Sequence, residues 1–244
     1  KLELLLKINQ KQNVTWAGKF RPSLSDQQVL PRAVDDHLNI WVAIGGTPES
    51  VELAGRLGIP VIFAIIGGNP AQFKPLFDYY KAVDGLRQIL WGLFMKVVVA
   101  DNCAIVVNEV FANQDSYNAT SLFIGAIFFA FQIYGDFSGY SDIAIGLSKL
   151  FGFDLMVNFK FPYFSRDIAE FWRRWHISLS TWFRDYIYIP LGGSKGTQWF
   201  QIRNVMIIFL VSGFWHGANW TYVAWGLFHA LLFLPLLLFN VNRS

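Results

Sequence analysis

The hydrophobic pattern changes character part-way along the chain. Residues 1–84 contain short apolar runs separated by polar and glycine-rich segments, whereas residues 85–244 contain long apolar stretches with few charges. Eight of the ten tryptophans fall in the second part. We therefore predict a small N-terminal α/β segment at residues 1–84 and a mainly α-helical, polytopic membrane segment at residues 85–244, with a boundary near Val83–Gly85.

The N-terminal segment repeats one pattern twice. Leu38–Ile44 and Val61–Ile66 are short apolar runs, each followed by a glycine pair and then by a helical pattern, at Pro48–Leu57 and Pro70–Val83. Each helical pattern begins with proline, which is favoured at the first position of a helix. A strand, a glycine turn and a helix, repeated, predict two βα units of a parallel sheet or barrel.

The first glycine pair, Gly45 and Gly46, is followed by Thr47 at the start of a predicted helix. Backbone N–H groups at such a turn bind phosphate well, because glycine lets the anion approach and the helix dipole favours it. The same glycines also serve simply to turn the chain. The pattern alone leaves these two interpretations open.

Apolar stretches suited to a membrane dominate the second segment. Leu86–Ala100 contains Lys96, so it either spans the bilayer or lies in its interface. Ser116–Gly135 carries no charge and is predicted to be a transmembrane helix. Two further stretches, Asn204–Phe214 and Trp220–Phe239, are joined by a short polar interruption.

A polar motif follows the predicted transmembrane helix, with the sequence Asp136-Phe137-Ser138-Gly139-Tyr140-Ser141-Asp142. Irregular polar backbone at membrane depth is tolerated only where it is buried in protein or lines an aqueous cavity. The alternative is an ordinary loop at the membrane surface. If the motif is buried, we expect Asp136 or Asp142 to pair with an arginine.

An amphipathic helix is predicted from Asp167 to a point before Pro190, and Glu170 completes a capping box at its start. At 100° per residue, one face carries Trp172, Trp175, His176, Leu179 and Phe183, and the other carries Arg174, Ser178, Thr181 and Asp185. This distribution indicates an interfacial or re-entrant helix. Spacing alone favours a packed, hydrogen-bonded role for His176.

Composition narrows the class of protein. The chain is 54% hydrophobic and 15% charged, against about 25% charged residues in an ordinary soluble domain. The net charge of +3 comes without a run of lysine and arginine, which gives nucleic-acid binding no support.

Cys103 is the single cysteine, which excludes an internal disulfide and a cysteine-based metal cluster. The chain starts at Lys1 and has no signal-peptide layout, so we expect a fragment or a processed piece.

His216 is the strongest candidate for chemistry. It lies in the polar interruption between two apolar stretches, where the charged imidazole is disfavoured and the neutral form is available as a base. Gly217 leaves room beside it, and Trp215, Asn219 and Trp220 would supply walls and hydrogen bonds. The position of His216 therefore predicts general base catalysis in a desolvated passage.

The other histidines receive simpler assignments. His229 lies in the middle of the last apolar stretch and is expected to pack against another helix, while His37 is expected at the surface. The chain has neither a G-x-S-x-G elbow nor an H-E-x-x-H motif. A hydrolase triad and a zinc protease are therefore unsupported, and we predict no metal site.

Three long motifs occur in the membrane segment: DFSGYSDIAIGLSKLFGF, FPYFSRDIAEFWRRWHISLSTWFRDYIYIPLGG and FLVSGFWHGANWTYVAWGLFHAL. They resemble the membrane-bound O-acyltransferase superfamily, specifically its bacterial alginate O-acetyltransferase branch, related to the D-alanyl transfer protein of teichoic acids. The resemblance covers residues 85–239. It implies a multi-pass enzyme of the bacterial inner membrane that passes an acetyl or other short acyl group from a thioester donor toward an exported polysaccharide such as alginate.

The resemblance also implies roles for single residues. The essential histidine of the family falls on His216, as general base, and its second histidine falls on His176, which would position donor or acceptor. The implied donor is acetyl-CoA or an acyl-carrier phosphopantetheine, as a co-substrate rather than a tightly bound cofactor. The implied partners are the lipid bilayer, a periplasmic acetyltransferase protein and the polysaccharide acceptor. The predicted substrate-binding residues are Trp172, Arg173, Arg174, Asp185, Trp215 and Asn219, with Arg173, Arg174 and Asp185 at the cytoplasmic mouth.

A second resemblance lies in the N-terminal segment. The motif IWVAIGGTPESVELAGRLGIPVIFAIIGG resembles the C-terminal part of luciferase-like, flavin-dependent monooxygenases, which are barrels that bind FMN. It implies that Gly45, Gly46 and Thr47 contact the FMN phosphate. Two alternatives to the acyltransferase hypothesis follow: an FMN-dependent oxidoreductase with a hydrophobic tail, and an inactive, truncated or fused membrane fragment.

Overall fold

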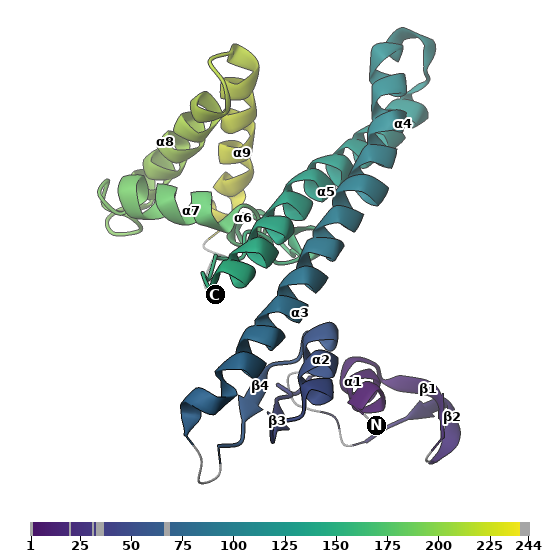
Figure 1. The fold of residues 1–244 in the computed structure, drawn as a ribbon. Helices are drawn as coiled ribbons and strands as arrows, with labels where there is room; N and C mark the ends of the chain where they lie inside the picture. The colour runs from purple at the N-terminus through teal and green to yellow at the C-terminus, as the bar shows by residue number, and fades with distance from the viewer. Residues whose placement is uncertain (1, 20, 31, 33–36, 66–68, 240–244) are drawn as a thin grey trace. The chain divides into compact units, whose positions relative to one another are not determined.

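The computed structural model describes residues 2–19, 21–30, 32, 37–65 and 69–239 (Figure 1). Its internal contacts divide the chain into two compact units, Lys1–Val83 and Asp84–Ser244. The described strands lie in the first unit, and the second is built from helices. This confirms the predicted fold class, a mainly helical membrane protein with a small N-terminal α/β part.

The first unit opens with a helix and a hairpin that the sequence pattern did not predict. Helix α1 spans Leu2–Gln10, and strands β1 (Asn13–Gly18) and β2 (Arg21–Gln28) pair antiparallel. Seven of the eight residues of β2 are exposed, so its sequence has no alternating apolar face to mark it as a strand.

The predicted βα units are present. Strands β3 (Val42–Ile44) and β4 (Val61–Phe63) pair in parallel, with helix α2 (Pro48–Leu57) between them. Both strands are shorter than the apolar runs that predicted them. Their small core consists of Ile44, Val51 and Ala54, with Val42, Val61, Phe63, Leu76 and Tyr80 packed against it. The second glycine pair, Gly67 and Gly68, lies outside the described residues.

One long helical segment runs through the predicted boundary. The 3₁₀ turn η1 (Pro70–Phe73) leads into α3 (Lys74–Leu93), the π-helix η2 (Phe94–Ala100) and α4 (Asp101–Ala112). Leu86–Ala100 is therefore part of a longer helix. After the 3₁₀ turn η3 (Gln114–Ser116), α5 spans Ala119–Phe151.

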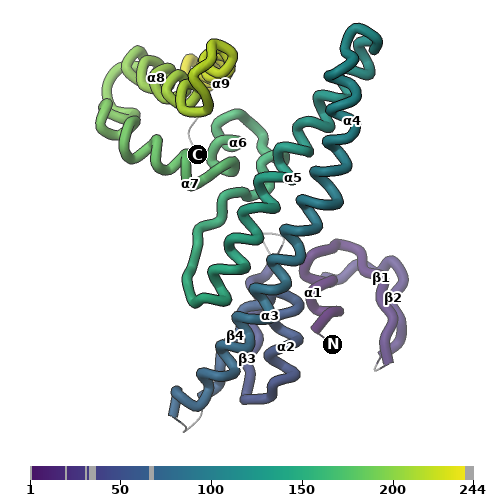
Figure 2. The backbone as a smooth tube through the Cα atoms, turned by 45° about the horizontal axis from the view of Figure 1, so that its top comes forward, coloured from purple at the N-terminus to yellow at the C-terminus, as the bar shows by residue number. Residues whose placement is uncertain are grey.

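Helices α3 and α5 lie side by side in both views (Figure 2). Glycines allow their backbones to approach closely: a Cβ on Gly92 would lie 2.5 Å from the carbonyl oxygen of Gly139. A Cβ on Gly146 would likewise lie 2.5 Å from the carbonyl oxygen of Gly85. Small residues serve the same purpose where helices pack in membranes.

The prediction of a possible loop at Asp136–Asp142 was wrong, because α5 continues through this motif. Its glycine packs against a neighbouring helix instead of turning the chain. The expected arginine partners were also wrong: Asp136 accepts a hydrogen bond from Lys96 at 2.7 Å, and Asp142 accepts one from Gln88 at 3.0 Å. Asp142 does line a small cavity, in agreement with the other interpretation of the motif.

The predicted helix from Asp167 is split into shorter elements. The 3₁₀ turn η4 (Pro162–Phe164) precedes α6 (Ile168–Arg174), α7 (Ile177–Phe183) and the π-helix η5 (Arg184–Tyr188). Half of the predicted capping box is confirmed, since the Asp167 carboxylate accepts a hydrogen bond from Glu170 N at 2.7 Å. The Glu170 carboxylate accepts from Arg166 N, at 2.9 Å, one residue before the N-cap.

The last two helices form a pair. Helices α8 (Gln198–His216) and α9 (Trp220–Leu238) pack along their lengths around Val205, Phe209 and Ala230. Among the described residues, three helical segments are long and apolar enough to cross a membrane: Pro70–Ala112, Ala119–Phe151 and Trp220–Leu238.

Candidate active site

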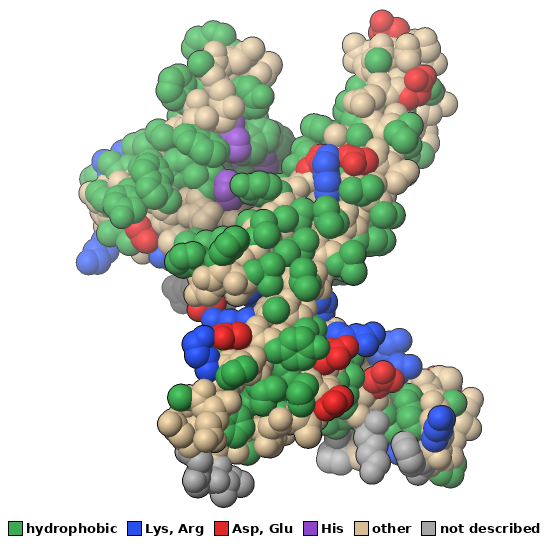
Figure 3. Space-filling model, in the orientation of Figure 1, with side chains coloured by type: hydrophobic (Ala, Val, Ile, Leu, Met, Phe, Trp, Pro, Cys, Tyr) green, Lys and Arg blue, Asp and Glu red, His purple; other side chains and the backbone are tan. Residues whose placement is uncertain are grey.

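A cavity of about 530 Å³ lies among α6, α7, η5, α8 and α9. Its lining is mostly apolar, but it includes the two histidines singled out from the sequence, His176 and His216. Figure 3 shows histidine side chains gathered among hydrophobic ones on this part of the molecule. The remaining lining residues are Ala169, Trp172, Arg173, Trp175, Ile177, Leu179, Ser180, Thr181, Phe183, Arg184, Tyr188, Val205, Ile208, Phe209, Ser212, Phe233 and Leu237.

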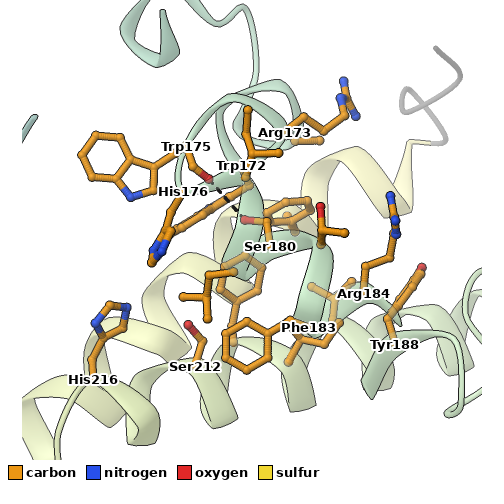
Figure 4. A pocket seen from close by; sticks show the side chains of 18 of the residues that line it. Trp172, Arg173, Trp175, His176, Ser180, Phe183, Arg184, Tyr188, Ser212 and His216 are labelled. Carbon is orange, nitrogen blue, oxygen red and sulfur yellow. Dashed lines mark hydrogen bonds between the residues drawn. The ribbon is translucent and has the colours of Figure 1, made fainter. Parts of the chain in front are cut away.

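The two imidazoles lie at one end of this cavity, with Ser212 beside them on α8 (Figure 4). His216 ends α8, and His176 lies in the break between α6 and α7. Forty residues therefore separate them in sequence, and only the packing of α8 against the α6–α7 segment brings both to one cavity.

The break at His176 is built by hydrogen bonds from a distant segment. His176 has φ 44° and ψ 55°, the left-handed conformation. Directly after it, Ile177 N donates to the Asn158 carbonyl oxygen at 3.0 Å. Ser178 donates to Asn158 Oδ1 from both its backbone N, at 3.2 Å, and its Oγ, at 2.6 Å. The prediction of one continuous helix was therefore wrong. Asn158 accepts hydrogen bonds from Ile177 and Ser178, and the helix is interrupted just before them, at His176.

Aromatic rings surround His176. The Phe137 ring of α5 contacts its imidazole edge-to-face, with ring centroids 4.6 Å apart. Phe159 packs on Phe137 and Trp175, and Trp175 stacks on Phe171. The prediction that His176 points with the aromatic residues is confirmed, although a broken segment rather than one helix face achieves it.

His216 contacts two indoles, Trp215 and Trp225, each with ring centroids 5.0 Å from the imidazole. The Trp225 ring also contacts the His229 ring, with centroids 4.5 Å apart. The His229 ring packs in turn against Trp172, with centroids 5.1 Å apart. The predicted packing role of His229 is therefore confirmed. Its Nδ1 and the Trp172 Nε1 are buried without a hydrogen-bonding partner among the described residues.

Arginines lie at the other end of the cavity. Figure 4 shows Arg173 and Arg184 directed away from the histidines. Arg174, by contrast, donates to Glu170 Oε1 at 2.5 Å and is not part of the lining. Asp185 accepts a hydrogen bond from Arg184 at 2.7 Å. The cationic pair that faces the cavity thus consists of Arg173 and Arg184.

Burial lowers the pKa of both histidines. Desolvation holds the pKa of His176 below 6.5, and the nearby His216 lowers it further because two positive charges would repel. Desolvation also lowers the pKa of His216, although this residue is exposed at the end of α8. Both imidazoles are therefore mainly neutral at pH 7, and each has a lone pair able to accept a proton.

Glu170 carries the opposite charge at the base of α6. Its carboxylate accepts hydrogen bonds from Arg166 N at 2.9 Å and Arg166 Nε at 3.0 Å, besides the one from Arg174. These bonds lower the pKa of Glu170 to about 2. The carboxylate therefore stays ionised at any physiological pH and fixes the helix that carries Trp172 and Arg173.

The structure brings some predicted site residues to the cavity and leaves others beside it. His216, His176, Trp172 and Arg173 line it. Trp215 touches His216 from outside the lining, and Asn219 caps α9 by accepting a hydrogen bond from Thr221 N at 3.1 Å. Sequence reasoning missed Ser180, Ser212, Arg184, Tyr188 and Trp225. Of these, Ser212 had a visible signal, since it lies four residues before His216 on the same helical face.

The N-terminal glycine turn leaves room for a phosphate but offers few groups to hold one. A Cβ added to Gly45 or Gly46 would meet no atom within 4 Å, so the space there is open. However, Pro48 at the helix start lacks an N–H, and the Thr47 hydroxyl bonds with Ser50 at 2.7 Å. The described parallel sheet has two strands, whereas a flavin-binding barrel of this type has eight. The described residues therefore do not supply the barrel wall that would hold the flavin ring.

Comparison with known families agrees with the membrane motifs. The chain belongs to the membrane-bound O-acyltransferase family, whose model matches residues 75–242. The model of the luciferase-like monooxygenases matches residues 1–132, so the N-terminal part also carries sequence of that family. Both resemblances found in the sequence are thereby confirmed, and the chain is a membrane protein by family and by its apolar helices.

Similar curated proteins come from several bacteria. The probable alginate O-acetylase AlgI of Azotobacter vinelandii is 43% identical over 194 residues, which are 76% of this chain and 39% of that protein. The peptidoglycan O-acetyltransferase of Helicobacter pylori is 45% identical over 66% of this chain and 31% of its own length. The teichoic acid D-alanyltransferase of Streptococcus thermophilus is 42% identical, over 66% of this chain and 44% of its own. The chain thus spans about two-fifths of the AlgI proteins that it matches.

Proposed function

We propose that the chain carries the reaction centre of a membrane O-acyltransferase that moves an acetyl or other short acyl group from a thioester donor toward an exported polysaccharide such as alginate. The observation that carries the proposal is the apolar cavity in which His176 and His216 lie together. The relatives named for alginate, peptidoglycan and teichoic acid support a cell-envelope polymer as acceptor.

His216 would act as general base. A hydroxyl group is a weak nucleophile until its proton is accepted in the transition state, which contributes about 10²- to 10⁴-fold. In the proposed step the acceptor oxygen attacks the thioester carbonyl as His216 takes its proton. The C–S bond then breaks, and the imidazolium returns the proton to the leaving thiolate. His176, fixed by Asn158, would orient the donor or the acceptor.

The arginine end of the cavity suits the donor. Coenzyme A and acyl-carrier phosphopantetheine both carry phosphate groups, which guanidinium groups bind well. Arg173 and Arg184 would hold these phosphates while the thioester arm reaches the histidines across the apolar lining. Trp172 would add a hydrogen bond to the acyl donor, since its indole Nε1–H lacks a partner among the described residues. We expect Arg174 to contribute through Glu170 rather than by touching the donor.

The setting of this centre also belongs to the proposal. We place it in a bacterial inner membrane as part of a multi-pass protein, because the matched relatives are longer than this chain. Helices outside the matched region would complete the enclosure around the cavity. A periplasmic acetyltransferase protein would then attach the acyl group to the polysaccharide.

Replacing the proposed base tests this function. We expect His216→Ala to lower transfer of labelled acetyl from acetyl-CoA by about 10²- to 10⁴-fold in membrane vesicles that contain the protein. The matched control is His37→Ala, because His37 is exposed and belongs to the first unit. Equal membrane content of the two variants separates lost chemistry from lost insertion. Full transfer by His216→Ala would remove this residue from the mechanism.

The match to luciferase-like monooxygenases supports a second candidate, an FMN-dependent oxidoreductase anchored by the apolar helices. It predicts a visible flavin absorbance band in the purified protein, with Gly45, Gly46 and Thr47 at the phosphate. Protein purified without flavin that transfers acetyl would exclude this candidate. Membrane insertion with neither flavin nor acetyl transfer would instead favour an inactive fragment.

A further inference from the structure

A second, smaller cavity of about 190 Å³ lies between α5 and the extended segment that follows it. Polar side chains make up about half of its lining, unlike the mostly apolar cavity of the two histidines. The lining residues are Trp91, Tyr134, Ser138, Ser141, Asp142, Ile145, Val157, Asn158, Phe159 and Phe161. Three of the polar ones, Ser138, Ser141 and Asp142, belong to the motif on α5 that the acyl-transfer mechanism does not use.

Ser138 is the side chain that points to a ligand. It is 4% exposed, it lines the cavity, and its Oγ, which lies near the Tyr134 hydroxyl, makes no hydrogen bond of normal geometry to the described residues. Helix α5 is long and apolar enough to cross a membrane, so hydrocarbon cannot satisfy this hydroxyl. A buried hydroxyl without a partner is costly, and ordered water or a ligand normally occupies such a position.

The charges beside the cavity are already balanced. Asp142 Oδ1 accepts from Gln88 Nε2 at 3.0 Å, and Gln88 Oε1 accepts from Lys149 at 2.7 Å. Lys149 also bonds with Asp84 at 2.5 Å, and Arg87 bonds with Asp84 at 2.9 Å. The carboxylates of Asp142 and Asp84 and the cations of Lys149 and Arg87 thus belong to one hydrogen-bonded network, which Gln88 links. A charged ligand would disturb this balance, so the network favours a neutral one.

The remaining lining groups indicate hydroxyl chemistry. Serine hydroxyls donate and accept, the Asn158 amide does both, and the Asp142 carboxylate accepts. Such a mixed set matches water or the hydroxyl groups of a sugar, which also both donate and accept. The aromatic residues Trp91, Tyr134 and Phe159 provide the apolar faces on which a sugar ring packs.

We propose that this cavity binds neutral hydroxyl groups, held by Ser138, Ser141, Asp142 and Asn158, and supplied either by ordered water or by one sugar ring. The site is connected to the reaction centre through Asn158. The Asn158 amide donates to Ser141 Oγ at 3.3 Å, and its oxygen accepts from Ser178 at 2.6 Å, two residues beyond His176. The bound hydroxyl groups therefore help to fix the turn that carries His176.

Thiol labelling tests the site without relying on acyl transfer, so it can fail independently of the proposed function. In a Cys103→Ser background, which removes the single cysteine, Ser138→Cys places a thiol in the cavity. The control is Ser148→Cys, because Ser148 is 7% exposed on the same helix but bonds to the Ile145 carbonyl and does not line the cavity. The reagent is methyl methanethiosulfonate, which reacts with the hydrated thiolate.

We expect Ser138→Cys to be labelled at least about tenfold faster than Ser148→Cys, since only a hydrated thiol ionises readily. Equal, slow labelling of the two thiols would overturn the proposal. If Ser138→Cys fails to fold, Ser141→Cys reports on the same cavity, because Ser141 also lines it and is 6% exposed.

Protection separates the two sources of hydroxyl groups. Slower labelling in the presence of methyl β-D-glucopyranoside would assign the cavity to a sugar ring, whereas fast labelling without protection would assign it to ordered water. Both outcomes support a site for neutral hydroxyl groups. Methyl β-D-glucuronide has the same ring with a negative charge, and we expect no protection from it. Protection by the glucuronide equal to that by the glucoside would overturn the inference that the ligand is neutral.

Discussion

His176 occupies a backbone conformation that costs a non-glycine residue about 1–3 kcal/mol. The surrounding bonds hold it there: Asn158 binds the two residues after it, and Lys160 N donates to the Arg174 carbonyl at 3.0 Å before it. Strained residues of this kind gather at functional sites, where the surrounding structure fixes them. The imidazole is thereby directed into the cavity by main-chain geometry together with its contact to the Phe137 ring.

Asn158 is therefore a positioning residue, and its removal is expected to impair the site without touching substrate. We predict that Asn158→Ala lowers kcat for acetyl transfer by about tenfold to hundredfold and changes KM little, because misplacement of a reacting group by about 1 Å costs this much. Asn158→Asp keeps the oxygen that accepts from Ser178 and should restore part of the rate. Michaelis–Menten kinetics of the variants check this.

The control is Asn113→Ala, since the Asn113 side chain donates locally, to Glu109, at the exposed end of α4. A merely structural role for Asn158 would instead lower the amount of folded protein and leave kcat of the folded fraction unchanged. That result, or a rate for Asn158→Ala equal to that of Asn113→Ala, would contradict the prediction.

The lowered pKa values of the histidines set a pH dependence. A base must be neutral to accept a proton, and the pKa values of His176 and His216 both lie below 6.5. We predict that kcat/KM for acetyl transfer falls as the solution is made acidic, with a midpoint below the ordinary histidine value of 6.5. A pH–rate profile in membrane vesicles measures this. A midpoint at or above pH 6.5 would mean that the reacting imidazole is not desolvated.

Sequence reasoning found the two histidines by different routes. The place of His216 between two apolar stretches was enough to single it out. His176 needed the family motif, because its spacing alone indicated a packed residue. Arg184 and Trp225 could not be found in this way, since their contact with the site depends on a π-helix and on the pairing of α8 with α9.

At the scale of elements, glycines decide how closely helices approach. A Cβ on Gly226 of α9 would overlap with the Phe209 carbonyl oxygen of α8. Helix α8 ends at His216, so the spacing of this pair also places the proposed base. The α3–α5 pair depends in the same way on Gly92 and Gly146.

We predict that Gly226→Ala destabilises the protein by about 1–3 kcal/mol, because the helices must separate or shift to admit the methyl group. Thermal unfolding in detergent, followed by circular dichroism, measures the loss as a lower Tm. Gly45→Ala is the control, since a Cβ there meets no atom within 4 Å. Equal Tm values for the two variants would show that α8 and α9 do not pack as closely as described.

The helix patterns predicted which elements exist better than where they end. Apolar stretches correctly indicated α5, α8 and α9. The predicted end of α5 at its polar motif was wrong, because Lys96 and Gln88 satisfy the two carboxylates within the helix packing. The helix predicted from Asp167 was wrong in the opposite sense, since hydrogen bonds from Asn158 interrupt it. Both errors come from partners distant in sequence. The partners of Asp136 and Asp142 lie 40 and 54 residues away, and Asn158 lies 20 residues before Ser178.

At the scale of the whole molecule, the apolar helices govern where the protein resides. We predict that the protein stays in the pellet when membranes are extracted with alkaline carbonate, because three helical segments in the described part of the chain are long and apolar enough to span the bilayer. Immunoblots of pellet and supernatant, with a flavin scan of both, check this. Release into the supernatant together with flavin would mean that the luciferase-like part determines the behaviour of the protein.

The sequence by itself determined the class of protein. Its long uncharged stretches require a membrane, its repeated apolar runs and glycine turns specify the small parallel sheet, and its motifs identify the acyltransferase family. These properties follow from local composition and periodicity, which need no knowledge of distant contacts.

The tertiary structure alone decided how the site is assembled. Residues from separate helices come together to decide three features of the site. These are the choice of arginines that face the cavity, the departure of His176 from the helical conformation, and the position of a buried serine that makes no hydrogen bond of normal geometry to the described residues. Hydrogen bonds and packing act over a few ångströms in space, whatever the separation in sequence. Local periodicity therefore carries no record of them.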